Sequence, residues 1–172
     1  MESAEWSERL PDEPVVRVGT IEELELIKDL WLEHYRTQKL NISLPPDAFE
    51  QWLGTMKPAY GRFTINFVAT AGGRIVGFLS GRVRTMPSYF GGGVCGYLTE
   101  ICVETEYRRH GLARKLLLAS FDWYQSQGIR RVESSVMLDN LASQKMAMSV
   151  GLNPEQYLLI WTPDSAEPRR EP

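Results

Sequence analysis

A basic, glycine-containing run in the middle of the chain holds the residues best suited to chemistry. It reads Arg108-Arg-His-Gly111-Leu-Ala113; an apolar stretch ends before it at Val103, and an amphipathic stretch follows it. Where a strand turns into a helix, unpaired backbone N–H groups and the positive end of the helix dipole can receive an anion. Gly111 lets a phosphate approach the backbone closely, and Arg114 adds positive charge. The run therefore predicts a phosphate-binding turn, with an ordinary strand-to-helix connection and a solvated basic patch as the alternative.

Hydrophobic periodicity predicts the elements that position this turn. A strand runs from about Val94 to Val103, and after the turn comes the most amphipathic helix of the chain, which ends at Gly128. One stripe of that helix holds the apolar residues Leu112, Ala113, Leu116, Leu117, Trp123 and Tyr124. A strand over Arg131 to Leu138 and a last strand over Tyr157 to Trp161 follow.

The first half of the chain predicts the rest of the sheet. A short strand covers Val15 to Val18, and Thr20-Ile-Glu-Glu23 has the capping-box form that opens a helix. A second helix runs from Pro46 to about Lys57, and two strands between Phe63 and Leu79 form a hairpin around Gly72-Gly73. A further helix, about 141–150, lies near the end of the chain. The order β-α-α-β-β-β-α-β-α-β predicts an α/β fold with a mixed sheet.

Composition narrows the class of protein. The 172 residues are 43% hydrophobic with a net charge of -3, so we expect one globular domain over residues 14–162 and mobile ends over 1–13 and 163–172. The charge argues against nucleic acid as a partner, and no apolar stretch is long enough for a membrane span. Cys95 and Cys102 have neither disulfide-framework nor metal-ligand spacing. We expect a cytoplasmic protein without a metal.

The sequence surroundings of the other candidate motifs argue against a function for them. Gly91-x-Gly93-x-x-Gly96 fits a dinucleotide fingerprint literally, but it precedes a strand instead of leading from a strand into a helix. No phosphate-binding loop of the G-x-x-x-x-G-K-[ST] type is present, so nucleotide hydrolysis is unsupported. His34 and His110 have no partners at ligand or triad spacing, and we interpret them as a helix-face residue and a turn residue.

Two segments together resemble the GNAT superfamily of N-acetyltransferases. The run from Val103 to Ala113 is similar to the family signature, a valine that ends the fourth strand followed at a fixed distance by Q/R-x-x-G-x-G/A. Asn140-x-x-Ser143-x-x-Met146, closed by Val150-Gly151-Leu152, resembles the second characteristic segment, usually N-x-x-A-x-x-L-Y-x-x-x-G-F. The two segments lie at the family's spacing, and with the order of elements the resemblance covers roughly residues 14 to 162.

The resemblance implies a GNAT-like sheet whose fourth and fifth strands splay apart to admit the pantetheine arm of acetyl-CoA, the acyl donor. The arm borrows backbone hydrogen bonds from the fourth strand, and the pyrophosphate meets the turn. By resemblance, the cofactor-binding residues are Ile101, Cys102, Val103, Arg108, Arg109, His110, Gly111, Leu112, Ala113, Arg114, Asn140 and Ser143. A simple helix N-cap explains Asn140 equally well.

The family chemistry is direct attack of a neutral amine on the thioester, which needs a base for the amine proton and a donor for the departing thiolate. Glu100, three residues before Val103, is our candidate base, acting directly or through a water. Tyr97 and Thr99 compete for that role, and a structural carboxylate is the alternative for Glu100. The family's usual tyrosine acid is replaced by Ala147. Another donor such as Tyr157 or water then serves the thiolate, or no acid is required.

The resemblance thus predicts an acyl-CoA-dependent N-acetyltransferase that acts on a primary amine of a small molecule or a peptide. The missing tyrosine motivates an alternative, a non-catalytic acyl-CoA-binding or sensor module. An interaction domain that kept only the fold would have no affinity for CoA. We expect the first two helices and the loops 39–46 and 85–93 to select the acceptor. The sequence leaves a homodimer open.

Overall fold

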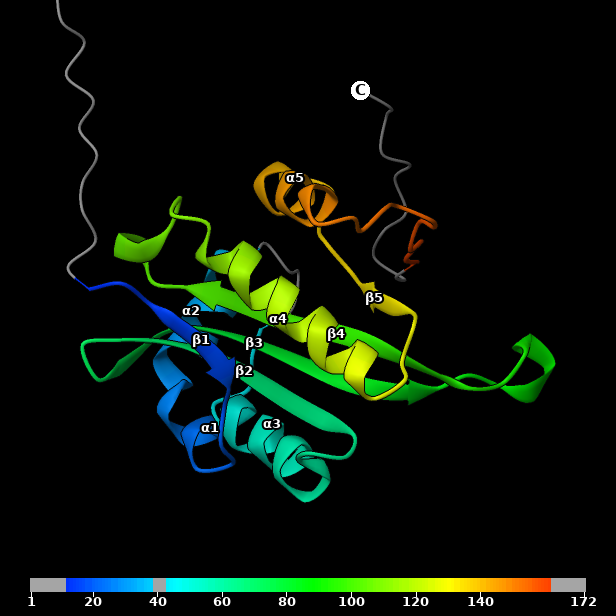
Figure 1. Ribbon diagram of the computed structural model, residues 1–172, viewed down its shortest axis with the longest axis horizontal. Coiled ribbons are helices and arrows are strands. Elements are labelled where there is room, and N and C mark those ends of the chain that lie inside the picture. The colour runs from blue at the N-terminus through cyan, green and yellow to red at the C-terminus, as the bar shows by residue number, and fades with distance from the viewer. Residues whose placement is uncertain (1–11, 39–42, 162–172) are drawn as a thin grey trace, which may run out of the picture.

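The computed structural model of the protein describes residues 12–38 and 43–161 (Figure 1). In chain order its helices and strands are β1 (Val15–Val18), α1 (Glu23–Leu26), α2 (Lys28–Thr37), α3 (Ala48–Met56), β2 (Thr64–Ala71), β3 (Arg74–Thr85), β4 (Val94–Val103), α4 (Leu112–Ser126), β5 (Val132–Ser134) and α5 (Leu141–Ser149). They follow the predicted order as far as α5, except that the first predicted helix is divided into α1 and α2. Short 3-10 turns lie between several of them.

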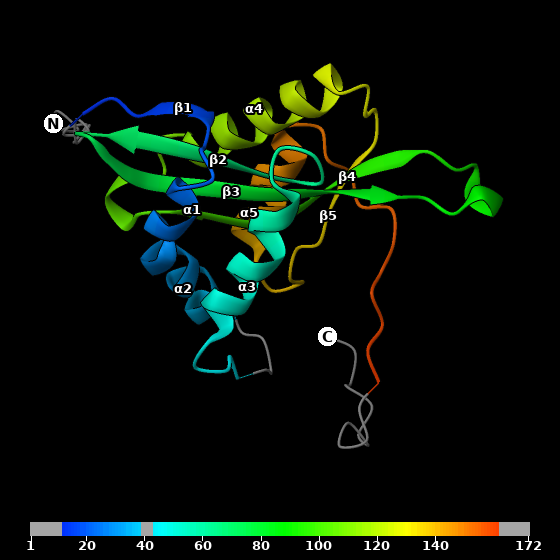
Figure 2. The same ribbon diagram turned by 90° about the horizontal axis from the view of Figure 1, so that it is seen from below.

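The strands form one sheet in the order β1-β2-β3-β4-β5. Neighbouring strands are antiparallel except for β4 and β5, which are parallel. Helix α4 covers one face of the sheet, and α1, α2 and α3 cover the other (Figures 1 and 2). The predicted α/β class with a mixed sheet is confirmed.

Local sequence signals account for the connections in the first half of the chain. The backbone N–H of Thr20 donates to the Glu23 carboxylate at 2.8 Å and the N–H of Glu23 donates to the Thr20 hydroxyl at 3.4 Å, which is the reciprocal capping box. Gly72 and Gly73 have φ angles of 55° and 77° in the turn between β2 and β3. Glycine enters this left-handed region without steric cost, so the predicted hairpin forms there.

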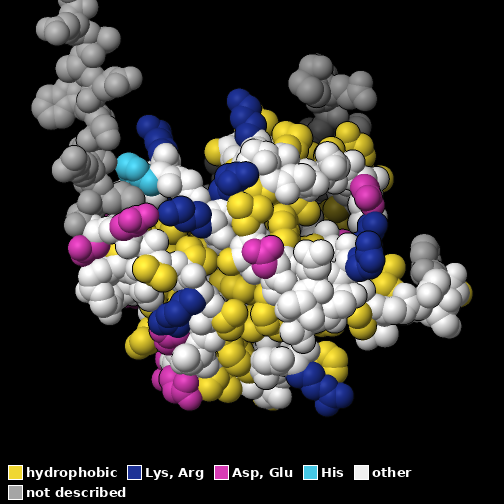
Figure 3. Space-filling view, viewed as in Figure 1, with side chains coloured by type: hydrophobic (Ala, Val, Ile, Leu, Met, Phe, Trp, Pro, Cys, Tyr) yellow, Lys and Arg dark blue, Asp and Glu magenta, His cyan; other side chains and the backbone are white. Residues whose placement is uncertain are grey.

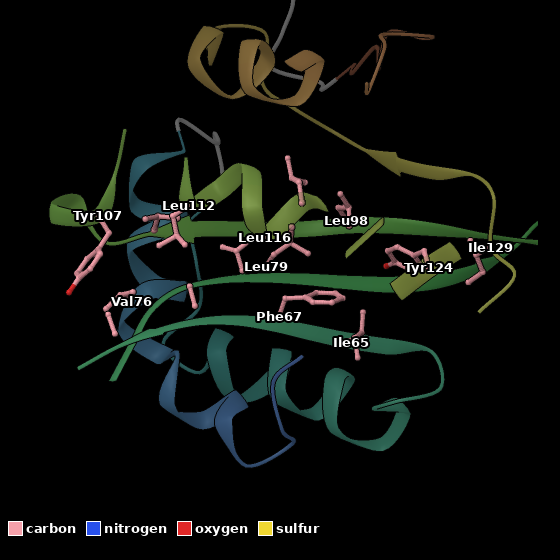
Figure 4. Close-up of a cluster of buried hydrophobic side chains, with 14 residues drawn as sticks. Ile65, Phe67, Val76, Leu79, Leu98, Tyr107, Leu112, Leu116, Tyr124 and Ile129 are labelled. Atoms are coloured by element: carbon pink, nitrogen blue, oxygen red, sulfur yellow. The ribbon is translucent and has the colours of Figure 1, made fainter. Parts of the chain in front are cut away.

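Two apolar clusters hold the layers together, one on each face of the sheet. Between α4 and the sheet, Leu116 and Tyr124 pack with Phe67, Leu79 and Leu98 (Figure 4). On the other face the cluster combines residues of the first three helices with residues of the strands: Leu24, Ile27, Leu30, Trp31, Phe49, Trp52, Met56, Val68, Phe78 and Cys102. Strand β2 is therefore covered on both faces, which explains its nearly unbroken run of buried residues, polar ones such as Thr64 and Asn66 included.

The side chain of Tyr124 determines how closely α4 packs against β3 and β4. A Cβ atom at Gly96 would lie 2.8 Å from ring atoms of Tyr124, and a Cβ at Gly81 would lie 2.3 Å from its hydroxyl oxygen. The hydroxyl donates to the carbonyl of Arg82 at 3.1 Å. Only glycine permits this close approach, so the two glycines set where the C-terminal end of α4 meets the sheet.

The C-terminal part of the sheet differs from the sequence prediction. The strand expected over Arg131 to Leu138 is reduced to β5, Val132–Ser134, and the last strand expected over Tyr157 to Trp161 does not form. A strand needs a partner, and β5 meets β4 at three positions only, while the final segment meets no strand. The ends predicted to be mobile, apart from Asp12 and Glu13, and part of the 39–46 loop lie outside the described residues.

Candidate active site

The sheet is split between β4 and β5. The two strands pair only from Gly96 with Val132 to Leu98 with Ser134, and β4 then continues to Val103 while β5 has ended. Figure 1 shows the chain after β5 leading away from β4 toward α5. The predicted splay is therefore present, and it leaves the second half of β4 with an open edge.

Backbone groups of β4 point into this open edge. The carbonyl of Ile101 accepts from the His34 ring nitrogen Nδ1 at 3.0 Å, and the carbonyl of Val103 accepts from Arg108 Nε at 2.8 Å. Because the N–H and C=O of one strand residue point to the same side, the N–H groups of Ile101 and Val103 also face away from β3. Cys102 lies between them, so its backbone faces Phe78 of β3. The edge therefore offers N–H donors at Ile101 and Val103, not at Cys102.

A β-bulge places Glu100 in the interior beside the split. Across β3 and β4, Leu79 pairs with Ile101 but Gly81 pairs with Leu98, so Thr99 and Glu100 together oppose Ser80. Glu100 is only 5% exposed. Its carboxylate accepts hydrogen bonds from the Tyr35 hydroxyl at 2.9 Å and from the Thr99 hydroxyl.

Two neighbouring side chains of α2 support this arrangement. Burial, reinforced by the charge of Glu100, raises the pKa of the Tyr35 hydroxyl, so Tyr35 remains a neutral donor. Burial lowers the pKa of His34, whose Nε2 lies 2.8 Å from Gln38 Nε2. A neutral ring that donates from Nδ1 to Ile101 and accepts at Nε2 from Gln38 satisfies both nitrogens. His34 thus lies on a face of α2 that is buried against the β4 edge.

The turn at residues 108–113, where we predicted phosphate binding, has a backbone suited to an anion. Arg109 has a φ of 65° and Gly111 a φ of 74°, and α4 begins at Leu112 without a side-chain cap. Among the described residues, the N–H groups of Leu112, Ala113 and Arg114 have no hydrogen-bond acceptor. Arg109 is the one described non-glycine residue with a positive φ, a strained geometry that is frequent at ligand-binding turns.

The side chains of the turn divide into two groups. Arg109, His110 and Arg114 are exposed beside the N-terminus of α4. Arg108 instead folds back, because its Nε binds the Val103 carbonyl and its Nη2 lies 3.9 Å from the Glu33 carboxylate. Arg108 therefore closes the turn onto β4 and α2.

Asn140, in the second segment that resembles the family, is the N-cap of a helix, which was the alternative interpretation of this residue. The Asn140 side-chain oxygen accepts from the backbone N–H of Ser143 at 3.1 Å at the start of α5. This cap uses Oδ1 and leaves the Nδ2 amide available to a ligand. Ala147 lies within α5, and Tyr157, the alternative thiolate donor, is 83% exposed in the final segment.

The structure therefore brings together Glu100, the β4 edge and the turn before α4, and it adds residues that sequence reasoning missed. Tyr35 and His34 come from a helix more than 60 residues earlier in the chain. The capping box at Thr20–Glu23 predicted a helix in this region, but no local signal connects that helix with Glu100. Tyr97, a competing base, has its hydroxyl 2.8 Å from Ser135 Oγ and its ring beneath Arg84.

No group of three or more His, Cys, Asp or Glu side chains in residues 12–38 and 43–161 could hold a metal ion. Within the same residues, no helix is both long and apolar enough to cross a membrane. Cys95 and Cys102 are buried thiols, and burial raises the pKa of each. The cytoplasmic location expected from the sequence stays a prediction.

The structure thus combines a mixed sheet that opens between its two parallel strands with a helix, after the fourth strand, whose first backbone N–H groups have no acceptor among the described residues. Residues 24–152 match the acetyltransferase (GNAT) family. The chain belongs to this family and is a GNAT-type acetyltransferase. No curated protein sequence gives a significant match.

Solved structures with a similar fold include aminoglycoside acetyltransferases. AAC(6')-Iy in complex with CoA has a TM-score of 0.72 and 20% identity, covering 90% of this chain and 97% of its own. An enzyme from an uncultured soil metagenomic sample, in complex with sisomicin, has a TM-score of 0.66 and 18% identity, with 87% and 94% coverage. AAC(6')-IG from Acinetobacter haemolyticus has a TM-score of 0.64 and 19% identity, with 86% and 97% coverage. At these identities the likeness concerns the fold.

Proposed function

We propose that this protein transfers an acetyl group from acetyl-CoA to a primary amine by direct attack within a ternary complex. The observation that carries the proposal is the position of Glu100, a buried carboxylate at a β-bulge beside the open edge of β4. A buried base next to a slot for an extended ligand is what amine acylation requires.

The chain offers complementary groups for CoA along one continuous path. The N–H groups of Ile101 and Val103 would bind the pantetheine amides, as a neighbouring strand would. The open amides of Leu112, Ala113 and Arg114, at the positive end of α4, would receive the pyrophosphate. Exposed basic side chains at Arg109 and Arg114 add attraction for the phosphates. Asn140 and Ser143 would contact the arm from the start of α5.

Glu100 takes the proton that the amine loses. The amine nitrogen forms a bond to the thioester carbonyl carbon, the carbon–sulfur bond breaks, and the amine proton passes to Glu100 directly or through one water. The departing thiolate needs little help, because a thiol has a pKa of about 8.5 in water. The absence of a tyrosine at Ala147 is therefore compatible with turnover, and water serves as the proton donor in place of Tyr157, which is exposed.

The acceptor is an amine of a small molecule or a peptide. The aminoglycoside enzymes of similar fold act on small amines, which supports the small-molecule class. Arg82 of β3 lies near the proposed site. Its Nη2 is 3.2 Å from the Thr55 hydroxyl, and its buried Nε has no hydrogen-bond partner among the described residues. An acceptor with an oxygen acceptor group near its amine would satisfy this Nε.

The alternative function, a module that binds acyl-CoA without turnover, is favoured by one observation, the alanine at position 147. Both functions require the same CoA site. A screen of amines with acetyl-CoA, read as release of the CoA thiol, separates them. Thiol release that depends on an amine supports the transferase, whereas tight CoA binding without release under any amine supports the binding module.

CoA binding itself gives a testable expectation. Titration with CoA should release or absorb heat with a dissociation constant in the micromolar range. At a CoA concentration of about 100 times this constant, mass action adds about 2.7 kcal/mol to the free energy of unfolding. For a domain of this size that raises the melting temperature by roughly 5–10 °C. A folded protein with no heat and no thermal shift at millimolar CoA would reject the CoA site.

Tyr35→Phe tests the support of Glu100. The variant removes the hydroxyl that donates to the Glu100 carboxylate, so turnover should fall by about 10-fold while CoA affinity stays constant. Tyr60→Phe is a matched control, because the Tyr60 hydroxyl donates at 2.8 Å to the carbonyl of Gly19, outside the Glu100 cluster. Steady-state kinetics and thermal melts of both variants make the comparison. Equal activity in the two variants would show that Tyr35 does not position the base.

A further inference from the structure

Arg82 of β3 differs from the other arginines that the structure describes. It is half-buried, whereas every other described arginine is exposed. On the face shown in Figure 3, Lys and Arg side chains are spread over the surface, and several lie beside Asp or Glu side chains. Ion pairs such as Arg17 with Glu23 at 2.6 Å and Arg131 with Glu155 at 2.7 Å are of this kind. Arg82 forms no ion pair with a carboxylate of the described residues.

The hydrogen bonds of the Arg82 guanidinium are incomplete. Nη2 donates to the Thr55 hydroxyl at 3.2 Å, but the buried Nε has no acceptor among the described residues. A buried donor without an acceptor costs free energy, and the cost is larger when the donor belongs to a charged group. An anion that accepted from this guanidinium would remove the cost and balance the charge.

Arg82 points to the same face of the sheet as Glu100. A Cβ atom on Gly81 would meet Tyr124 of α4, so the next residue of the strand, Arg82, points to the opposite face. Helices α2 and α3 cover that face. There Thr55 of α3 accepts the hydrogen bond from Arg82, and Tyr35 of α2 donates one to Glu100. The guanidinium and the proposed base therefore lie under the same pair of helices.

The two groups are also close along the sheet. Arg82 is opposite Tyr97 of β4, three residues before Glu100. At roughly 3.3 Å per residue, at most about 10 Å of strand separates these two positions. Burial and the charge of Glu100 raise the pKa of the Tyr35 hydroxyl, and the charge of Arg82 acts on it in the opposite direction. The distance suits a small molecule with one polar group at each end.

The charges around this position are mostly positive. Arg84 lies two residues farther along β3, on the same face, and its guanidinium carbon is 3.2 Å from the centroid of the Tyr97 ring. Strands β3, β4 and β5 contain two carboxylates, Glu100 and Glu133. Glu133 pairs with Arg131 at 2.6 Å. Such surroundings repel an acceptor with several ammonium groups and attract one that carries a negative group.

We propose that the acceptor is a small amine that carries a carboxylate, of the amino-acid class, with its amine at Glu100 and its carboxylate at Arg82. This inference rests on the proposed function, because it names the substrate class of the acetyl transfer. The planar fork of a guanidinium matches the two oxygens of a carboxylate. The amine nitrogen bonds to the acetyl carbon, the carbon–sulfur bond breaks, and the products are an N-acetylated acid and CoA. Arg82 takes no part in these bond changes and determines specificity.

The first test compares acceptors that differ only in the carboxylate. A panel of free amino acids is assayed with acetyl-CoA against the corresponding amino-acid carboxamides, and release of the CoA thiol is measured. For the best amino acid, kcat/KM should exceed that of its carboxamide by about 10–100-fold, the usual contribution of a hydrogen-bonded charge. Spermidine, a polyamine without a carboxylate, should be a poorer acceptor than this amino acid.

Variants of Arg82 test whether this residue causes the preference. In Arg82→Gln the ratio of kcat/KM for acid and carboxamide should fall to about 1, mainly through a higher KM for the acid. Arg82→Lys keeps the charge without the fork and should retain part of the preference. Arg74→Gln is the matched control, because Arg74 lies at the other end of β3 and pairs with Glu104. A merely structural role of Arg82 would lower the rates of both acceptors and leave their ratio unchanged.

Calorimetry provides a readout that does not depend on turnover. Amino acids are titrated into the CoA-bound protein, and Arg82→Gln should weaken their binding by the same 10–100-fold. Binding of this kind without thiol release from any amine would reject acetyl transfer and still support carboxylate recognition. The proposal would be overturned if carboxamides or spermidine matched the amino acids, if Arg82→Gln kept the wild-type ratio, or if no amino acid bound.

Discussion

Glu100→Gln should lower turnover by roughly 10²–10⁴-fold, the usual loss when a general base is removed. The substitution preserves the size of the side chain. The amide oxygen still accepts from the Tyr35 hydroxyl, and the Thr99 hydroxyl can rotate to accept from the new amide nitrogen. The variant should therefore fold, and only the basic lone pair is lost. Affinity for CoA should barely change, because the pyrophosphate turn lies beyond Val103.

The loss should also depend on pH. An alkyl amine such as that of lysine has a pKa of about 10.4, so the neutral amine is scarce at pH 7 and becomes abundant as the pH rises. Where the amine has already lost its proton, less depends on a base. The ratio of wild-type to variant turnover should therefore shrink toward high pH. Steady-state kinetics across pH with a working acceptor measure this ratio.

Glu104→Gln provides the control for Glu100→Gln. Glu104 follows the same strand, but its carboxylate is partly exposed and pairs with Arg74 at 2.6 Å. Its replacement should leave turnover close to that of the wild type. If Glu100→Gln also kept full turnover at neutral pH, the base would lie elsewhere, at Tyr97 or in a chain of waters, and Glu100 would be a structural carboxylate.

Much of the fold could be predicted because its signals are local. The Thr20–Glu23 capping box, the Gly72-Gly73 turn and the single apolar stripe of α4 each depend on residues near in sequence, and each is present in the structure. The bounds of β4 match the prediction at Val94 and Val103. The geometry of the turn at residues 108–113 shares this property, because the end of a strand, a glycine and the start of a helix lie close together in sequence. That the turn binds phosphate stays a prediction.

The errors occur where an element depends on a distant partner. Tyr157 to Trp161 has the composition of a strand, but composition does not provide the edge to which a strand must bind. The support of Glu100 was missed for the same reason, because Tyr35 is 65 residues away and only the folded sheet brings α2 against β4. The bulge that turns Glu100 inward arises from a register shift between β3 and β4, and such a shift leaves no mark in periodicity.

Gly111→Val should lower the affinity for CoA by about 10-fold or more while the protein remains folded. Gly111 has a φ of 74°, and a Cβ atom built on it meets nothing within 4 Å. The new side chain would therefore enter the space in which a phosphate approaches the backbone. It would also strain the backbone, because a branched residue rarely adopts a positive φ. A loss of affinity alone could then reflect a distorted fold.

Gly73→Val separates these two effects. Gly73 has a φ of 77° and equally open surroundings, but it lies in the turn between β2 and β3, away from α4. The two variants should lose a similar free energy of unfolding, about 1–3 kcal/mol. Only Gly111→Val should weaken CoA binding in calorimetry, because only that valine stands before the open amides of Leu112 to Arg114. If both variants bound CoA as the wild type does, the pyrophosphate would have to be held somewhere other than this turn.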